Sequence, residues 1–201
     1  MIYGTILKKE RRNMKYSKIA SFIKKSKRLV VHDPKDAEQW ISDGSAAYPV
    51  LGMPKMTAKE LLTFLSFQEN DNIDVTEWST GGMNFSDTDQ REQLIERFGP
   101  TLLIGDEECT VFYTTIGALL VKAAYLVPAY SHYGDGELSY YLRYSGENPY
   151  IAVKKGLYMI AAITPVQTWD IGNATLARYK EFCRLLELAN DNMKSGEEGE
   201  E

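Results

Sequence analysis

The sequence predicts a single α+β domain, with an antiparallel sheet of hairpins and a meander, three or four helices and a C-terminal amphipathic helix. Hydrophobic residues make up 44% of the 201 residues, which is enough to form a core and argues against a disordered chain. Segments with helical spacing and segments with strand-like alternation are grouped separately along the chain, whereas a doubly wound α/β fold alternates them. Glycine and proline divide the strand-like segments at short intervals, as hairpins require.

A short basic helix opens the predicted domain, and two extended segments follow it. The apolar stripe of the helix consists of Tyr16, Ile19 and Ile23. Residues 28–33 predict a buried strand that ends at Pro34, which has no backbone N–H to donate to a neighbouring strand. Residues 40–52 predict a second extended segment with a turn at Asp43-Gly44. We expect the two extended segments to pair as a hairpin.

Two capping boxes predict the next helices. In the first, the Thr57 hydroxyl accepts from the backbone N–H of Glu60, whose side chain reaches back, so a helix runs to about Phe67. The second spans residues 87–90 and predicts a helix with Leu94, Ile95 and Phe98 buried, ended by Gly99-Pro100. Between them, an exposed loop with a short strand near Val75 is expected. The remaining elements are a meander over residues 102–121, a hairpin over residues 150–163 and the amphipathic helix over residues 173–189. Residues 137–144 fit a helical turn or a strand, and a short helix is favoured.

Charge is distributed unevenly and helps to set the expected boundaries. Residues 1–28 hold ten basic side chains against one acidic, Glu10, whereas the rest of the chain holds 13 basic and 27 acidic side chains. Met14 resembles a natural start, so residues 1–13 are predicted to be an N-terminal extension of a domain over residues 14–191. Residues 192–201 are rich in glutamate and predict a disordered acidic tail.

The composition also limits the cellular setting. The sequence has no apolar run of about 18 residues or more, so no transmembrane helix is expected. It lacks the apolar segment of a secretory signal, and its two cysteines, Cys109 and Cys183, are too few for a disulfide framework. We therefore expect a cytoplasmic protein that needs no membrane, while the formation of a homo-oligomer stays open.

The most distinctive segment is Trp40-x-Ser-Asp-Gly-Ser-Ala-x-Tyr-Pro-x-x-Gly-x-Pro54. Its turn residues, small residues and prolines restrict the backbone, so Trp40 and Tyr48 are expected to be buried and residues 42–45 to form a bend. Together with Leu61-Leu-Thr, Asp87-Thr-Asp and Tyr125-Leu-x-Pro, this segment resembles an uncharacterised family found in prophages and integrative elements of Gram-positive bacteria. The resemblance spans residues 14–190. It implies a mobile-element setting, and it implies no established activity and no catalytic residues.

The best group of reactive side chains predicts a small hydrolase as one alternative. It comprises His32, Asp33, Asp43 and Ser45, and the expected hairpin would bring Ser45 near His32. Ser45 lies in no Gly-x-Ser-x-Gly elbow, so turn formation explains this segment better than catalysis. A metal would draw on His32, Asp33, His132 and Asp135, but the spacing of metal motifs is absent. No metal or other cofactor is expected.

Two further groups are candidate binding surfaces. Residues 8–28 carry cations that would contact nucleic-acid phosphates, with Lys24, Lys25, Lys27 and Arg28 as candidate contacts. Tyrosines cluster between residues 125 and 150, and tyrosine is enriched at protein interfaces. The candidate protein interface consists of Tyr130, Tyr133, Tyr140, Tyr141 and Tyr144.

The leading functional hypothesis is a non-enzymatic accessory protein of a mobile element that binds a protein partner. A role in element replication or in inhibiting host defence would fit the setting that the resemblance implies. A nucleic-acid-binding protein using residues 8–28 and a small hydrolase are the alternatives.

Overall fold

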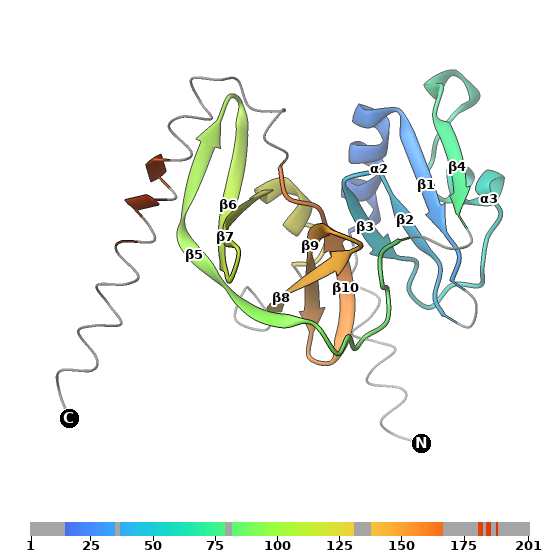
Figure 1. Ribbon diagram of the computed structural model, residues 1–201. Coiled ribbons are helices and arrows are strands. Elements are labelled where there is room, and N and C mark those ends of the chain that lie inside the picture. The colour runs from blue at the N-terminus through green and yellow to red at the C-terminus, as the bar shows by residue number, and fades with distance from the viewer. Residues whose placement is uncertain are drawn as a thin grey trace. The chain divides into compact units, whose positions relative to one another are not determined.

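The chain forms two compact units in the computed structural model (Figure 1). The structure describes residues 15–34, 37–78, 82–130, 138–166, 181, 182, 184, 185 and 188. Unit 1 comprises residues 1–94 and 124–164, and unit 2 comprises residues 95–123 and 165–201. The candidate sites developed below all lie in unit 1.

Unit 1 contains seven strands in the order β4-β1-β2-β3-β10-β9-β8. Their bounds are β1 Arg28–His32, β2 Trp40–Ser42, β3 Ala46–Pro49, β4 Asp74–Trp78, β8 Leu138–Ser145, β9 Asn148–Lys155 and β10 Tyr158–Ile163. Strand β4 runs parallel to β1, whereas the other neighbours are antiparallel. The predicted strand at residues 28–33, its pairing with the next segment and the hairpin at residues 150–163 are confirmed.

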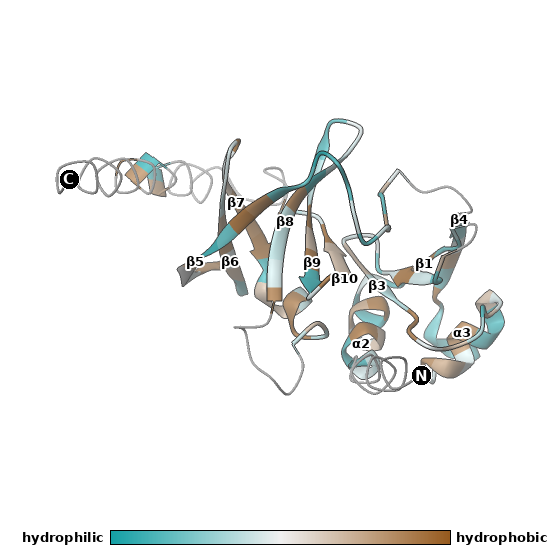
Figure 2. Cartoon of the chain, turned by 90° about the horizontal axis from the view of Figure 1, so that it is seen from below, coloured by the Kyte–Doolittle hydropathy of each residue, from teal (hydrophilic) through white to brown (hydrophobic). Residues whose placement is uncertain are grey.

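Helices α2 (Tyr16–Ser26) and α3 (Ala58–Phe64) lie on the same face of the β4-β1-β2-β3 end of this sheet (Figures 1 and 2). Ile19 and Ile23 of α2 and Leu61 of α3 are fully buried, so the predicted apolar stripe of α2 is confirmed. The capping box of Thr57 and Glu60 is also present, although α3 ends three residues before Phe67. Two short 3₁₀ turns, η1 (Glu69–Asp71) and η2 (Ala123–Leu126), complete the described helical elements.

Alternation along β1 directs its side chains to two faces. Successive strand residues point to opposite sides, so Arg28, Val30 and His32 share one face, and Leu29 and Val31 share the face that α2 and α3 cover. Pairing carries this sorting to the neighbours, because Val30 lies opposite Ser42 of β2 and Val31 lies opposite Glu77 of β4. The two rows line different cavities.

Unit 2 contains the predicted meander. Its strands are β5 (Gln93–Ile104, of which residues from 95 onward belong to this unit), β6 (Glu107–Thr114) and β7 (Gly117–Lys122). Neighbouring strands pair antiparallel. The core of the meander is formed by Cys109, Val111, Ala118 and Leu120, with Phe98, Leu102, Val166 and Phe182 packed against it.

The predicted fold class is wrong, because strands dominate and the sheet of unit 1 is mixed. Within the described ranges, only α2 and α3 are helices with defined bounds, not three or four. The helix expected from residues 87–98 is instead a turn followed by β5. The Asp87 carboxylate accepts from the backbone N–H of Met159 at 2.8 Å, so it does not cap a helix. Leu94, expected to be buried, is 69% exposed, and Gly99-Pro100 lies at a register shift inside β5, where proline is tolerated.

The short helix expected at residues 137–144 is also wrong. Residues 138–145 form β8, which pairs along its whole length with β9. Tyrosine and leucine suit a half-buried pleated surface, and eight backbone pairings with β9 outweigh the local helical spacing. Pairing with β9 therefore determines that residues 138–145 form a strand.

Only part of the predicted C-terminal helix can be assessed. Residues 181, 182, 184, 185 and 188 are helical, and Leu185 and Leu188 are exposed. Residues 1–13 and 192–201, and the candidate residues His132, Tyr133 and Asp135, lie outside the described residues. None of the helices in the described part of the chain is long and apolar enough to cross a bilayer.

Candidate functional site

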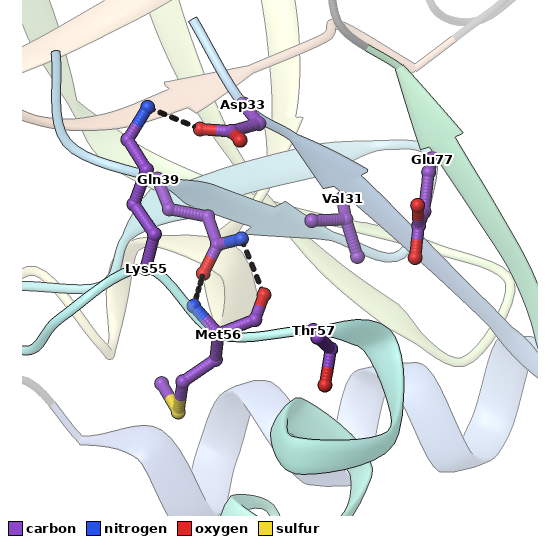
Figure 3. Close-up of a pocket in the computed structure, with 7 residues that line it drawn as sticks. All are labelled: Val31, Asp33, Gln39, Lys55, Met56, Thr57 and Glu77. Carbon is purple, nitrogen blue, oxygen red and sulfur yellow. Dashed lines mark hydrogen bonds and ion pairs between the residues drawn. The ribbon is translucent and has the colours of Figure 1, made fainter. Parts of the chain in front are cut away.

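A cavity of about 510 Å³ lies beneath strand β4 (Figure 3). It is lined by Val31, Asp33, Gln39, Lys55, Met56, Thr57 and Glu77, and is called the β4 cavity. Because Val31 and Glu77 are register partners, their side chains share a face, and Figure 3 shows both pointing toward the segment that carries Met56 and Thr57. Glu77 therefore brings a carboxylate of the edge strand β4 into the lining of the cavity.

Internal hydrogen bonds fix one wall of the β4 cavity. The Gln39 side-chain amide donates to the Met56 carbonyl at 2.8 Å and accepts from the Met56 N–H at 3.1 Å, as a neighbouring strand would (Figure 3). Lys55 Nζ lies 2.5 Å from Asp33 Oδ1 and donates to the Pro34 carbonyl at 2.9 Å. The Lys55 charge is thus matched by Asp33, and Glu77 leaves the cavity with a net negative charge.

Strand β4 is an open edge. Among the described strands it pairs only with β1. Asp74 and Glu77 are exposed, and neither makes an ion pair with any described residue. They point to opposite faces of the strand, since their register partners Arg28 and Val31 do so. The edge therefore offers unpaired backbone groups flanked on both faces by carboxylates.

A second cavity of about 510 Å³ shares Gln39 and Lys55 with the β4 cavity. Its floor is aromatic, with the rings of Trp40 and Phe85 stacked at 4.7 Å between centroids. Asp87 at its rim is held by the Met159 N–H. This cavity is mainly a consequence of how residues 84–92 pack over the sheet.

The third cavity, of about 220 Å³, surrounds His32. The polar residues that line it are Arg28, His32, Ser42, Ser45 and Ser145, and it is called the His32 cavity. His32 Nε2 lies 3.3 Å from Ser42 Oγ, so the histidine contacts Ser42, where Ser45 was expected. Burial lowers the His32 pKa from 6.5 to about 4, and the imidazole is neutral at pH 7. The Ser42 hydroxyl also accepts from the Gly44 N–H at 3.3 Å.

The two carboxylates expected to complete a catalytic triad are bound elsewhere. Asp43 Oδ1 accepts from the N–H groups of Ser45 and Ala46, both at 2.9 Å, and Asp43 Oδ2 accepts from the Tyr125 hydroxyl at 2.8 Å. Asp33 pairs with Lys55. A serine–histidine pair without an orienting carboxylate is poorly equipped for nucleophilic catalysis. Asp43 instead fixes the predicted bend, with Trp40 and Tyr48 buried as expected.

Replacing Asp43 by alanine is expected to lower the free energy of unfolding by about 3 kcal/mol, because three hydrogen bonds to a buried carboxylate are lost. Urea unfolding followed by circular dichroism measures the change. Asp33→Ala is the matched control, and its exposed ion pair predicts a loss of at most about 1 kcal/mol. Equal losses in the two variants would contradict the structural role of Asp43.

The basic residues predicted to contact phosphates are in different environments. Lys24 Nζ lies 2.8 Å from Asp71 Oδ1, and Lys27 Nζ donates to the Asp71 carbonyl at 2.9 Å. The Gln68 N–H and then Lys24 hold the Asp71 pKa below its usual value. Lys25 is exposed on α2, whereas Arg28 lines the His32 cavity.

The described tyrosines of the candidate interface are buried or half-buried. Tyr140 is 7% exposed, and Tyr130, Tyr141 and Tyr144 are half-buried. Lys154 Nζ lies 4.2 Å from the centre of the Tyr141 ring, a cation–π contact within the sheet. Most of this group thus forms part of the wall of unit 1.

Sequence patterns gave no sign of a buried ion cluster at Glu92, Arg143 and Lys154. Arg143 is completely buried and contacts Glu92 Oε2 with two nitrogens at 2.5 and 2.8 Å. Lys154 Nζ contacts Glu92 Oε1 at 2.6 Å. Arg143 also donates to the carbonyls of Asn84, Ser86 and Asp87. This cluster holds residues 84–92 against β8 and β9.

Within the described residues, no group of three or more His, Cys, Asp or Glu side chains is placed to hold a metal ion. Cys109 is a free, buried thiol whose pKa burial raises, so it is not a reactive cysteine.

No protein-family model matches the chain, and neither a curated protein nor a solved structure matches it. The resemblance to the prophage and integrative-element family therefore stays a prediction.

Proposed function

We propose that this protein is a non-enzymatic binding protein that captures a basic, extended segment of a protein partner along the edge of β4. The observation that carries the proposal is the open edge itself, with exposed Asp74 and Glu77 beside the β4 cavity. An extended peptide adds to such an edge through main-chain hydrogen bonds, while neighbouring pockets accept alternate side chains. Lysine or arginine side chains entering the β4 cavity would meet Glu77.

Charge argues for a basic partner rather than a second copy of β4. Two β4 edges would bring Asp74 and Glu77 together with their own copies, and like charges opposite each other destabilise strand pairing. A basic strand has the complementary charge on both faces. The family resemblance adds a setting for this proposal, in which the protein assists replication of a mobile element or inhibits host defence.

The alternatives have less support from the described geometry. Lys24 and Lys27 are engaged by Asp71, which weakens the case for a nucleic-acid surface on α2. In the hydrolase alternative, the two carboxylates expected to orient His32 are engaged elsewhere, Asp33 by Lys55 and Asp43 by the bend and Tyr125.

A fluorescence anisotropy titration with a labelled, alternating lysine–threonine heptapeptide tests the proposal. The full chain is expected to bind this peptide and to show no measurable binding of an alternating glutamate–threonine heptapeptide. Glu77→Gln with Asp74→Asn should weaken binding about tenfold, since each exposed ion pair is worth ~0.2–1 kcal/mol. The matched control is Glu108→Gln with Glu147→Gln, which removes the same charge from exposed residues outside β4.

Equal affinity of the wild type for the basic and acidic peptides would contradict the proposal, as would equal weakening by the two double substitutions. Binding should also fall as salt rises, because the contributing charges are exposed.

A further inference from the structure

We propose that the His32 cavity is a binding site for a phosphate-sized oxyanion. The cavity lies on the face of β1 opposite the helices, and no residue of the β4 cavity lines it. It is formed by one row of β1 side chains, the bend at residues 43–45 and the end of β8. The proposal does not rest on peptide capture at the β4 edge, although Asp74 of that edge is the register partner of Arg28.

The charge of this cavity differs from that of its two neighbours. Each of the cavities of about 510 Å³ is lined by two carboxylates, whereas none of the described residues lining the His32 cavity is acidic. Arg28 supplies the cationic group, and it forms no ion pair with a described residue. In a chain with 28 acidic and 23 basic side chains, a carboxylate-free cavity with an unpaired guanidinium favours an anion.

Glycine at position 44 allows the guanidinium to reach the cavity. Gly44 has φ of +95°, and a Cβ on it would lie 3.2 Å from Arg28 Nη1. The arginine side chain therefore crosses the backbone of the bend at close range. Asp43 fixes the bend, because its carboxylate accepts hydrogen bonds from the N–H groups of Ser45 and Ala46 and from the Tyr125 hydroxyl.

Hydroxyl groups complete the donor set. Ser45 Oγ and Ser145 Oγ make no hydrogen bond with a described residue, and both serines line the cavity. A Cβ at position 82 would lie 2.5 Å from Ser145 Oγ, so glycine there leaves the space that this hydroxyl occupies. A guanidinium with several hydroxyl donors matches the oxygens of a phosphate group.

Size limits the ligand to a small one. A volume of about 220 Å³ corresponds to about seven water molecules at ~30 Å³ each. A phosphate group with a few further atoms fits this volume, whereas a nucleotide is too large to be enclosed. The ligand class is therefore inorganic phosphate or the monoester of a small molecule.

Isothermal titration calorimetry with the full chain tests the proposal, using inorganic phosphate and glycerol 3-phosphate at constant ionic strength. We expect saturable binding of at least one of them, weakened about tenfold by Arg28→Gln, because a charge-assisted hydrogen bond is lost. Arg91→Gln removes an exposed arginine elsewhere in unit 1 and should leave affinity unchanged. Tighter binding of inorganic phosphate would identify a site for the free ion, and tighter binding of glycerol 3-phosphate a site for a monoester.

Ser45→Ala and Ser145→Ala are each expected to weaken binding about threefold, which corresponds to the loss of one hydrogen bond. Gly82→Ala should weaken binding about as much as Ser145→Ala, because its methyl group displaces Ser145 Oγ. If Gly82→Ala does not fold, the two serine variants still test whether the hydroxyl groups contribute to anion binding. Absence of saturable binding by the wild type, or equal affinity in the wild type and Arg28→Gln, would overturn the proposal.

Discussion

Replacing Arg143 by methionine is expected to lower the free energy of unfolding of unit 1 by about 3 kcal/mol. Removing one partner from a buried ion pair typically costs ~3–5 kcal/mol, and Lys154 still neutralises Glu92 in this variant, which places the effect at the lower end. The carbonyls of Ser86 and Asp87 also lose the arginine donor, whereas the Asn84 carbonyl keeps the hydrogen bond from the Tyr150 hydroxyl. Urea unfolding monitored by tryptophan fluorescence gives the value, and Trp40 lies in the affected region.

Arg143→Lys is expected to rescue little of this stability, because a single ammonium cannot span the glutamate and three carbonyls that the guanidinium reaches. Arg91→Met is the control, since Arg91 is exposed on the same segment and its change should stay within about 0.5 kcal/mol. If Arg143→Met and Arg91→Met unfold at the same urea concentration, the buried cluster does not hold residues 84–92.

Acidification from pH 7 to pH 4 is expected to destabilise the protein by up to about 3 kcal/mol through His32 alone. The His32 pKa is about 4 in the folded chain and 6.5 as its ordinary value. Between these values the unfolded chain binds the proton and the folded chain does not, so stability falls as the pH falls. At about 1.36 kcal/mol per pKa unit, the shift sets this upper limit.

The carboxylates with lowered pKa act in a different window. Asp71 and Asp89 have pKa values below 3.8 in the folded chain, so most of their stabilising effect is lost below pH 4. The effect of Glu60, whose pKa is lowered from 4.5, begins to be lost just above pH 4 and does so equally in the wild type and in a His32 variant. Urea midpoints measured in phosphate-free buffer from pH 7 to pH 4 should therefore fall for the wild type and stay nearly flat for His32→Gln. Parallel curves for the two proteins would show that the His32 pKa is not lowered in the folded state.

Local patterns predicted the parts of unit 1 whose structure depends on nearby residues. The bend at Asp43-Gly44 follows from Asx-turn chemistry, since the Asp43 carboxylate accepts N–H groups two and three residues ahead. The capping box at Thr57 needs no distant contact. Trp40 and Tyr48 are 3% and 1% exposed because β2 and β3 are interior strands of the sheet that are buried along their whole length.

Patterns failed where a distant residue competes for a local group. The second capping-box pattern holds no cap, because the Asp87 side chain binds Met159 at a separation of 72 residues. Arg143 and Glu92 meet across 51 residues, and no spacing rule connects them. The contact of His32 with Ser42 rather than Ser45 depends on strand register, which places Ser42 opposite Val30. The sequence therefore predicted that the segments around His32 and Ser45 pair, but it did not predict which side chains contact His32.

The most direct test of the proposed function follows the backbone amide signals of β4 by ¹H–¹⁵N NMR while the alternating lysine–threonine peptide is added. Strand addition predicts shifts and slower hydrogen exchange for residues 74–78, with smaller shifts at Asp33, Lys55 and Thr57 around the β4 cavity. Asp74→Asn with Glu77→Gln should remove these changes. Shifts confined to α2, or peptide binding without any change in β4, would contradict capture at this edge.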